Sequence, residues 1–422
     1  MGKYQVKLTR RNFVKASAAA AALTYGASHF TGVFEPAAAD AAAAQEGVKL
    51  VRTVCAPNCV NSCGHLVHVK DNRIIKVEPA DFPDNRYKRI CLKGISSAMQ
   101  RTYSPDRVKY PMMRVGKRGE GKWKRVSWDE AYDYIADKIK SMQAQYGDGA
   151  MAWMSMTGDY GIFGQLISHR IANVMKGTIL TNLGIMGDLA SNIGFFPATG
   201  MLQDGHPWPD LMNCKLNIFF ACNYAETSLN DTRFIWDAME NGMKLIVVDP
   251  RFSNTASKAD QWIALRPGTD AAMMLGMANV ILSKNLHDRQ FLAQNTNGTF
   301  LVRTDNGRFI KAKDISGGSS DEFMVIDALT GAVRMRSDAG AALSGKITVS
   351  LADGSKVECC TAWDLIADYI RQWPVEKASE VCEVPAEVIT KLAVEYAAPH
   401  PAAIRISQGS NRYWQGHQGF RN

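Results

Sequence analysis

The sequence predicts an α/β fold in which a small, cysteine-rich N-terminal domain with a β-hairpin precedes doubly wound α/β domains. In the middle of the chain, short apolar runs alternate with helical patterns, as in βαβ units whose parallel strands are covered by helices on both faces. Residues 296–358 carry short β-like runs between Gly, Asp and Ser turns, which predict a small antiparallel insertion. The length of 422 residues allows several domains.

Residues 1–46 have the composition of a signal peptide and linker rather than of a folded domain. Basic residues precede the small-residue apolar stretch 16–27, and alanine runs that follow it offer cleavage sites. The segment 9–15, Thr-Arg-Arg-Asn-Phe-Val-Lys, is similar to the twin-arginine consensus, whose export route carries proteins that are already folded. We therefore expect export to the periplasm or the outer face of the cell membrane. The alternative is that these residues are a basic amphipathic segment that does not direct export. No later apolar run is long enough to predict a membrane span.

Four cysteines are spaced so that a loop and a returning segment can surround one inorganic centre: Cys55, Cys59, Cys63 and Cys91. The runs 66–69 and 74–77 flank a polar turn and predict a β-hairpin that would bring Cys91 back beside the first three. Four thiolates at one point predict a [4Fe-4S] cluster. A structural zinc site, which usually pairs its cysteines more evenly, and two disulfides in an exported chain are the alternatives.

The basic charge of the chain is concentrated in one segment. The formal net charge is +8, and residues 86–126 contain thirteen Lys and Arg against Asp106 and Glu120. Such a segment attracts anions. A phosphate-bearing cofactor or an acidic partner is favoured over a merely solvated face. Nucleic acid ranks last, because the segment has neither aromatic interleaving nor a nucleic-acid-binding motif.

The α/β part begins with a predicted helix at Ser127, which forms a capping box with Glu130. A strand is predicted at 150–154 and a helix at 162–175.

A βαβ unit follows, with strands at 216–221 and 244–248 and a helix at 231–241. In such sheets ligands bind beyond the carboxyl ends of the strands, where the polar loops 222–227 and 249–253 lie. A third polar loop, 266–270, precedes an apolar helix. Further on, helices are predicted at 362–373 and 385–397, the second with Pro385 in its first turn, and a strand at 402–406.

The predicted domains are 1–46, the signal peptide and linker; 47–115, the cluster domain; 116–160 with 386–422, an incomplete α/β domain; and 161–385, an inserted cofactor-binding α/β domain that carries the β-rich insertion.

These motifs resemble those of the catalytic subunits of the dimethyl sulfoxide reductase family, which are bis(molybdopterin guanine dinucleotide) enzymes of molybdenum or tungsten. The resemblance rests on the leader, on the cysteine set ending Cys91-Leu92-Lys93-Gly94, and on Val248-Asp249-Pro250-Arg251 and Arg266-Pro267-Gly268-Thr269-Asp270, in the family's order. The segment 103–111 is similar to the membrane-anchored branch of the family. Family chains are longer, so the resemblance implies that part of the cofactor cradle and the C-terminal β-barrel domain are absent from this sequence.

The resemblance assigns the four cysteines to the cluster and further residues to the contacts with the pterin cofactor. The cofactor residues would be Lys93, Asn223, Glu226, Asp249, Arg251 and Asp270. Lys93 would lie between cluster and pterin, and Asp270 would bond the guanine base, because a carboxylate accepts hydrogen bonds from guanine N–H groups. Arg251 would pair with a phosphate. The alternatives are a helix N-cap for Asp270 and a surface ion pair for Arg251.

The resemblance also points to the protein ligand of the metal. The serine-ligated pattern of the family places its serine two residues after an aspartate, but this sequence has Ala190 at that position. Asp188 would give the aspartate-ligated pattern, and a hard carboxylate suits a high-valent metal. Ser191 is the second candidate. Turn or helix-capping roles are the alternatives for both residues.

Together these features imply an exported oxidoreductase catalytic subunit that exchanges electrons between a [4Fe-4S] cluster and a molybdenum or tungsten centre. The expected reaction is reduction of a small oxidised substrate, such as an S-oxide, N-oxide or oxyanion, or a reductive dehydroxylation. The expected partners are an iron–sulfur subunit, a membrane anchor subunit and a downstream polypeptide that supplies the missing half. Two alternatives are an inactive N-terminal fragment that binds at most the cluster, and a ferredoxin-like carrier, which would need no guanine loops.

Other chemically conspicuous residues are expected to be structural. The remaining cysteines are more often small buried hydrophobes than ligands: Cys214, Cys222, Cys359, Cys360 and Cys382. His169 and His206 are expected to be structural histidines rather than proton donors.

Overall fold

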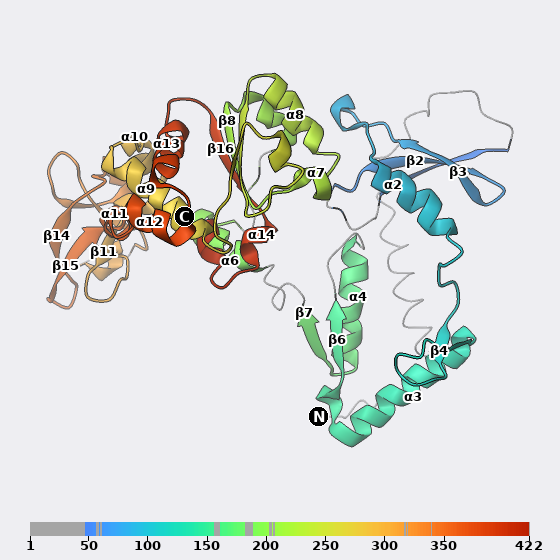
Figure 1. Cartoon of the computed structure of the whole chain (residues 1–422). Helices are drawn as coiled ribbons and strands as arrows, with labels where there is room; N and C mark the ends of the chain where they lie inside the picture. Colours follow the sequence, from blue (N-terminus) through green and yellow to red (C-terminus); the bar gives the residue numbers. More distant parts are fainter. Residues whose placement is uncertain are drawn as a thin grey trace. The chain divides into compact units, whose positions relative to one another are not determined.

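The computed structural model describes residues 47–55, 59, 61–155, 161–181, 189–201, 205, 207–315, 318, 320–338 and 340–421 (Figure 1). Residues 47–51 and 67–76 form one compact unit, and the other described residues form a second. The expected export signal, residues 1–46, lies outside the described residues. Within the described ranges, no helix combines the length and the apolar character needed to cross a lipid bilayer.

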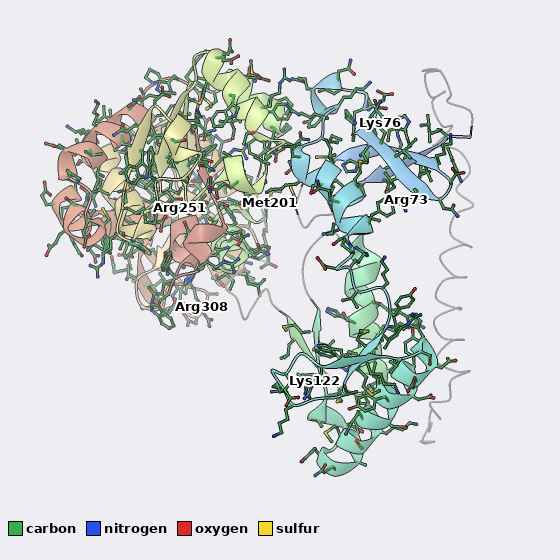
Figure 2. The ribbon with its side chains drawn as sticks, turned by 45° about the vertical axis from the view of Figure 1, so that its right-hand side comes forward. Arg73, Lys76, Lys122, Met201, Arg251 and Arg308 are labelled. Carbon is green, nitrogen blue, oxygen red and sulfur yellow. The ribbon has the colours of Figure 1, made fainter. Side chains whose placement is uncertain are left out.

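The first strands of the described chain form a three-stranded sheet with the order β1-β2-β3: β1 Lys49–Val54, β2 Gly64–Lys70 and β3 Arg73–Pro79. The turn between β2 and β3 consists of Asp71 and Asn72, with φ of 50° and 57°. Both residues of a type I′ hairpin turn need positive φ, which Asn and Asp tolerate better than most residues. The predicted hairpin is therefore confirmed; Figure 2 labels Arg73 and Lys76 on β3.

The basic segment contains short elements that the sequence analysis did not predict. A short helix, α2, covers Leu92–Ser96, and an antiparallel hairpin pairs β4 (Met112–Arg114) with β5 (Trp123–Arg125). The predicted capping box at the next helix, α3 (Trp128–Tyr146), is confirmed. Ser127 Oγ accepts from the amide of Glu130 at 3.1 Å, and Glu130 Oε2 accepts from the amide of Ser127 at 3.4 Å.

A small parallel pair follows α3. β6 (Ala152–Ser155) pairs with β7 (Thr178–Thr181), and α4 (Gly161–Val174) connects the two strands. Further along the chain lie α6 (Leu189–Thr199) and the 3₁₀ segment η4 (Trp208–Asn213).

The central sheet is parallel, with the order β10-β9-β8-β16. Its strands are β8 Leu216–Phe220, β9 Lys244–Val248, β10 Gln261–Ile263 and β16 Ala402–Ile406. Every residue of β8 is buried, as expected for a strand that is covered on both faces. The chain runs from β8 through β9 to β10 in one direction, whereas β16 lies on the other side of β8. The sheet therefore has a topological switch point between β8 and β16, where ligands of open α/β sheets bind.

Helices cover both faces of this sheet (Figure 1). On one face, Leu216, Ile218 and Phe220 pack with side chains of three helices: α9 (Asp270–Ser283), α12 (Val375–Cys382) and α13 (Ala386–Tyr396). On the other face, Phe219 packs with α8 (Thr232–Glu240) and η4. This alternation confirms the doubly wound α/β prediction.

The insertion has a hydrophobic core of its own, built around Leu301, Ile310 and Val349. Its strands are antiparallel, as predicted, although β13 and β15 were not expected: β11 Leu301–Arg303, β12 Met324–Ile326, β13 Val333–Met335, β14 Lys346–Ser350 and β15 Lys356–Thr361.

The remaining helices surround the insertion or complete the chain: α10 Arg289–Asn295, α11 Ala362–Arg371, α12 Val375–Cys382, α13 Ala386–Tyr396, α14 Gln408–Asn411 and α15 His417–Arg421. Pro385 is the N-cap of α13, one position before the first-turn position predicted for it. We expected residues 386–422 to share an α/β domain with residues 116–160, but β16 instead pairs with β8 along its whole length. Sequence alone does not specify which strand a C-terminal strand pairs with.

Candidate cofactor site

The four predicted cluster cysteines line one small cavity: Cys55, Cys59, Cys63 and Cys91. A backbone hydrogen bond beside the small sheet positions two of them, because the amide of Cys55, the residue after β1, donates to the carbonyl of Cys63 at 2.8 Å. Cys91 is the N-cap residue of α2. The hairpin therefore returns the chain to the first three cysteines, as the spacing predicted.

Gly94, on α2, allows close approach at the wall of this cavity. A Cβ atom at this position would lie 2.8 Å from Nε2 of His65 and 3.1 Å from Sγ of Cys55. His65 is only 3 % exposed, and its Nε2 finds no hydrogen-bond partner in the part of the chain that the structure describes. A buried polar atom that faces a cavity is suited to contact a polar group bound in that cavity.

The arrangement of the cysteines fits an iron–sulfur cluster better than the two alternatives. No disulfide links any of the nine cysteines, all of which are described. Across the described ranges, no three His, Cys, Asp or Glu side chains are arranged to hold a single metal ion. A single zinc ion would need four ligands converging on one point, whereas a [4Fe-4S] cluster distributes four thiolates over several iron atoms. Burial raises the pKa of the Cys63 thiol, and a hydrogen bond from Asn230 opposes this rise.

The second group of predicted residues lies at the carboxyl ends of β8 and β9. Asn223 Oδ1 accepts from Thr255 Oγ1 at 2.9 Å, and this hydroxyl in turn accepts from the amide of Ala225 at 3.0 Å, so the loop after β8 is held to the loop after β9. The guanidinium of Arg251 lies 3.3 Å from Oε1 of Glu226 and is largely exposed (Figure 2). The ion pair proposed as an alternative for Arg251 is present, and its exposed guanidinium still has N–H groups available for an anion.

Asp270 begins α9, and only 7 % of its surface is exposed. Thr269, not Asp270, is the N-cap residue of this helix, so capping does not account for the aspartate. Ser410 Oγ, from the short helix α14 after β16, donates to Asp270 Oδ1 at 3.1 Å. Burial raises the pKa of Asp270, and burial likewise raises the pKa of Asp249. Two poorly solvated carboxylates at one end of a sheet are suited to accept N–H donors of a ligand.

The loops after β8 and β16 meet at the switch point. A Cβ atom at Gly409 would lie 2.6 Å from the Cβ of Ala221, so glycine is needed for this close approach. The amide of Ser407 donates to the carbonyl of Phe220 at 3.0 Å. Asp270 receives its hydrogen bond from Ser410 on α14, the helix that Ser407 begins as N-cap, and this places its carboxylate near the switch point.

The cluster segment and the loop after β8 are in direct contact. Lys93, two residues after Cys91, donates a hydrogen bond from Nζ to the backbone carbonyl of Glu226. Asn230, in the segment between α7 (Tyr224–Thr227) and α8, donates to Sγ of Cys63. Residues predicted for the two cofactors therefore lie on contacting segments.

Of the two candidate metal ligands, Asp188 lies outside the described residues. Ser191 is buried on α6 and lines a second cavity, of about 610 Å³, together with Tyr224, Ser407 and Gln408. This cavity follows β16 and opens beside the loops at the switch point. His169 lies on α4, half-buried, and His206 is outside the described residues.

The five other cysteines are buried. Burial raises the pKa of the Cys222 thiol to about 12, which keeps it protonated. These residues behave as the small hydrophobes that the sequence analysis expected.

Sequence reasoning missed four polar residues of the site: His65, Asn230, Thr255 and Ser410. Each acts on a partner that is distant in sequence or faces a cavity, and no local pattern distinguishes such a residue from an ordinary loop residue.

Comparison with known proteins identifies the class of this site. The molybdopterin oxidoreductase family matches residues 107–420, and the molybdopterin oxidoreductase Fe4S4 domain matches residues 48–104. The protein therefore belongs to the class of molybdopterin oxidoreductases with an N-terminal [4Fe-4S] domain. The chain belongs to the molybdopterin oxidoreductase family, whose cofactors are a [4Fe-4S] cluster and a molybdopterin.

Several proteins of known name are similar to this chain in sequence. The chain is 31 % identical to the perchlorate reductase subunit alpha of Dechloromonas aromatica over 97 % of this chain and 49 % of that protein. It is 38 % identical to the dimethyl sulfoxide reductase DmsA of Haemophilus influenzae over 68 % of this chain and 38 % of that protein. The chain thus spans about half the length of the curated relatives it matches, or less.

Among solved structures, the acetylene hydratase from Pelobacter acetylenicus matches with a TM-score of 0.58 and 24 % identity, over 88 % of this chain and 42 % of that one. At this identity the likeness shows the shared fold.

Proposed function

We propose that this chain is the cluster-bearing and nucleotide-binding part of an exported oxidoreductase catalytic subunit. Its cofactors would be a [4Fe-4S] cluster and a bis(molybdopterin guanine dinucleotide) centre of molybdenum or tungsten. The observation that carries the proposal is the contact of Lys93 with the carbonyl of Glu226, which joins the cysteine cavity to the loop expected to approach the nucleotide. A cluster carrier that served no pterin would not need this contact.

The residues of the chain have separate tasks in this proposal. The four cysteine thiolates hold the cluster, and Lys93 provides a positive charge beside it. Asp270 and Asp249 accept N–H groups of the guanine nucleotide, while Arg251 binds its phosphates. When bound, the cluster supplies one-electron transfer and the metal supplies two-electron chemistry at the substrate. Asp188 and Ser191 are proposed as candidate protein ligands of that metal.

The proposed reaction is reduction of a small oxidised substrate. Relatives are named perchlorate reductase, dimethyl sulfoxide reductase and respiratory nitrate reductase, so an oxyanion, S-oxide or N-oxide is the proposed substrate class. The names that specify a subunit alpha or a catalytic subunit support partner subunits, for which we propose an iron–sulfur subunit and a membrane anchor. Export through the twin-arginine route, to the periplasm or the outer face of the membrane, is proposed from residues 9–15.

Anaerobic purification of the chain, with assays of iron, sulfide, zinc and released guanine nucleotide, tests the cofactor assignment. We expect four iron atoms per chain and the electron paramagnetic resonance (EPR) signal of a reduced [4Fe-4S] cluster. Cys91→Ala should lose this signal, whereas Cys360→Ala, at a buried cysteine in the insertion, should keep it. Zinc without iron would contradict the cluster assignment.

Reductase activity is tested on the complete enzyme, in which the chain is assembled with its proposed partner subunits. Oxidation of a reduced viologen dye is followed with perchlorate, nitrate, dimethyl sulfoxide and an N-oxide as separate substrates. Turnover of at least one of these substrates is expected. A complex that contains both cofactors and turns over none of them would contradict the proposed reaction class.

A further inference from the structure

Asn230 connects the cysteine cavity to the α/β part of the chain. Its side-chain Nδ2 donates to Sγ of Cys63 at 2.9 Å and to the backbone carbonyl of Arg89 at 3.3 Å. The residue is partly buried and lines the same cavity as the four cysteines. Both of its acceptors belong to the segment that carries the cluster cysteines, 167 and 141 residues away in sequence.

These two contacts fix the orientation of the amide. One amide nitrogen carries two N–H groups, and here each has its own acceptor. Only the nitrogen can donate, so the oxygen of Asn230 cannot take its place without the loss of both hydrogen bonds. The N–H group that faces Cys63 is therefore held in place rather than free to rotate.

The charged groups around Asn230 are themselves poorly solvated. The guanidinium of Arg89 lies 4.0 Å from the centre of the Phe234 ring, and Asp231, the next residue after Asn230, is 8 % exposed. In such surroundings a hydrogen bond is electrostatically stronger than in water. The neutral amide of Asn230 supplies a hydrogen-bond donor to the sulfur without adding a further charge to these poorly solvated surroundings.

A hydrogen bond to a ligating sulfur changes the energy of the two redox states of a cluster by different amounts. The reduced cluster carries one more negative charge than the oxidised cluster, so its sulfur atoms accept hydrogen bonds more strongly. Hydrogen bonds to the sulfurs are one of the determinants of cluster reduction potential.

We propose that Asn230 is a positioning residue that raises the reduction potential of the cluster through its hydrogen bond to the Cys63 thiolate. The inference rests on the proposed cluster at the four cysteines. It gives the chain between β8 and α8 a second role beside nucleotide binding. The same segment of chain, residues 223–230, would then contact the nucleotide with its first residues and set the driving force for electron transfer with its last.

The test is an anaerobic redox titration of the whole chain, followed by the EPR signal of the reduced cluster. Asn230→Ala should shift the ratio of reduced to oxidised cluster about ten-fold at a fixed potential, which is about 59 mV toward lower potential for one electron. Asn230→Asp preserves the shape but replaces the donor by a carboxylate, so at pH 8 it should lower the potential further. Asn241→Ala is the matched control, because this amide also donates to a backbone carbonyl, that of Met212 at 3.2 Å, but does not line the cysteine cavity.

The outcomes separate the inference from the cofactor assignment. Four iron atoms per chain in both variants, together with potentials equal to that of the unmodified chain, would overturn the role of Asn230 and leave the cluster in place. An equal shift in Asn241→Ala would also overturn it, because the effect would then not be specific to the sulfur contact. If Asn230→Ala fails to retain iron, the test rests on the isosteric Asn230→Asp. A cluster reduction potential in Asn230→Asp at or above that of the unmodified chain would count against the inference. Absence of a [4Fe-4S] cluster from the unmodified chain would overturn the proposed function and this inference together.

Discussion

Nζ of Lys93 donates a hydrogen bond to the backbone carbonyl of Glu226, so the helix that follows Cys91 touches the loop that follows β8. A lysine here acts in two ways, as a donor that connects the segments and as a positive charge beside the cluster cavity. Both actions follow from its position two residues after a cluster cysteine.

Replacing this lysine should slow electron transfer without removing the cluster. For Lys93→Met in the complete enzyme we expect kcat with a reduced viologen dye to fall about ten-fold, corresponding to about 1.4 kcal/mol in the barrier. Iron content should not change. Lys122→Met, at an exposed lysine paired with Glu120, is the control and should keep full activity (Figure 2). Equal kcat in both variants would contradict a role for Lys93 in electron transfer.

The wall of the cysteine cavity should not tolerate a side chain at Gly94. In Gly94→Ala the new methyl group meets His65 and Cys55 at distances that force one of them to move. We expect iron content to fall below half and the free energy of unfolding of the loaded chain to drop by about 1–3 kcal/mol. Gly149→Ala is the control, since a Cβ there meets no atom within 4 Å. Full iron content in Gly94→Ala would show that the cavity accommodates the methyl group.

Arg251 should contribute to the binding of guanine nucleotides by the chain. Its guanidinium is largely exposed, and its ion pair with Glu226 at 3.3 Å leaves N–H groups for phosphate oxygens. For Arg251→Ala we expect the Kd of guanosine diphosphate, measured by calorimetry, to rise about ten-fold, or about 1.4 kcal/mol. Arg308→Ala, on the insertion, tests for a non-specific effect of charge (Figure 2). An equal loss in both variants would point to general electrostatic attraction instead of a site.

Asp270 should make the stability of the ligand-free chain fall as the pH rises. Burial raises its folded-state pKa above the unfolded value, so the folded state holds its proton more tightly. The stabilisation from this proton is complete below the unfolded pKa and is lost as the pH rises through the folded pKa. Denaturant unfolding of Asp270→Asn should therefore show a free energy of unfolding that improves, relative to the unmodified chain, between pH 4 and pH 7. A difference that does not change with pH would show that Asp270 does not titrate in this way.

Features with a local cause could be predicted from the sequence. The hairpin turn at Asp71 and Asn72 and the capping box at Ser127 depend on neighbouring residues alone, and both are present. The strands Lys244–Val248 and Ala402–Ile406 are apolar runs between turn residues, and they were predicted at their observed bounds. By contrast, β10 has three residues, one of them Trp262 with 37 % of its surface exposed, and so lacks the buried apolar run that identifies a strand.

Features that depend on tertiary placement could not be predicted. The contact of Asn230 with Cys63 joins residues 167 positions apart, and no sequence pattern around either residue predicts that the two meet. The hydrogen bond of Ser410 to Asp270 likewise exists only because β16 lies beside β8. The cysteines could be predicted because the ligands of a cluster have a characteristic spacing in the sequence. The polar residues around a cofactor have no such spacing, because only their positions in the folded structure bring them to it. The role of Asp188 stays a prediction, since it lies outside the described residues.

The position of β16 has a practical consequence for anyone who purifies this chain. Within the described ranges β16 pairs with β8 alone, so no described strand pairs with its other edge. Its flank is a cavity of about 610 Å³ lined largely by apolar residues. An open strand edge of this kind is a template for intermolecular β-pairing. If copies of the purified chain pair at this edge, self-association should grow with protein concentration, and Ile404→Lys should reduce it.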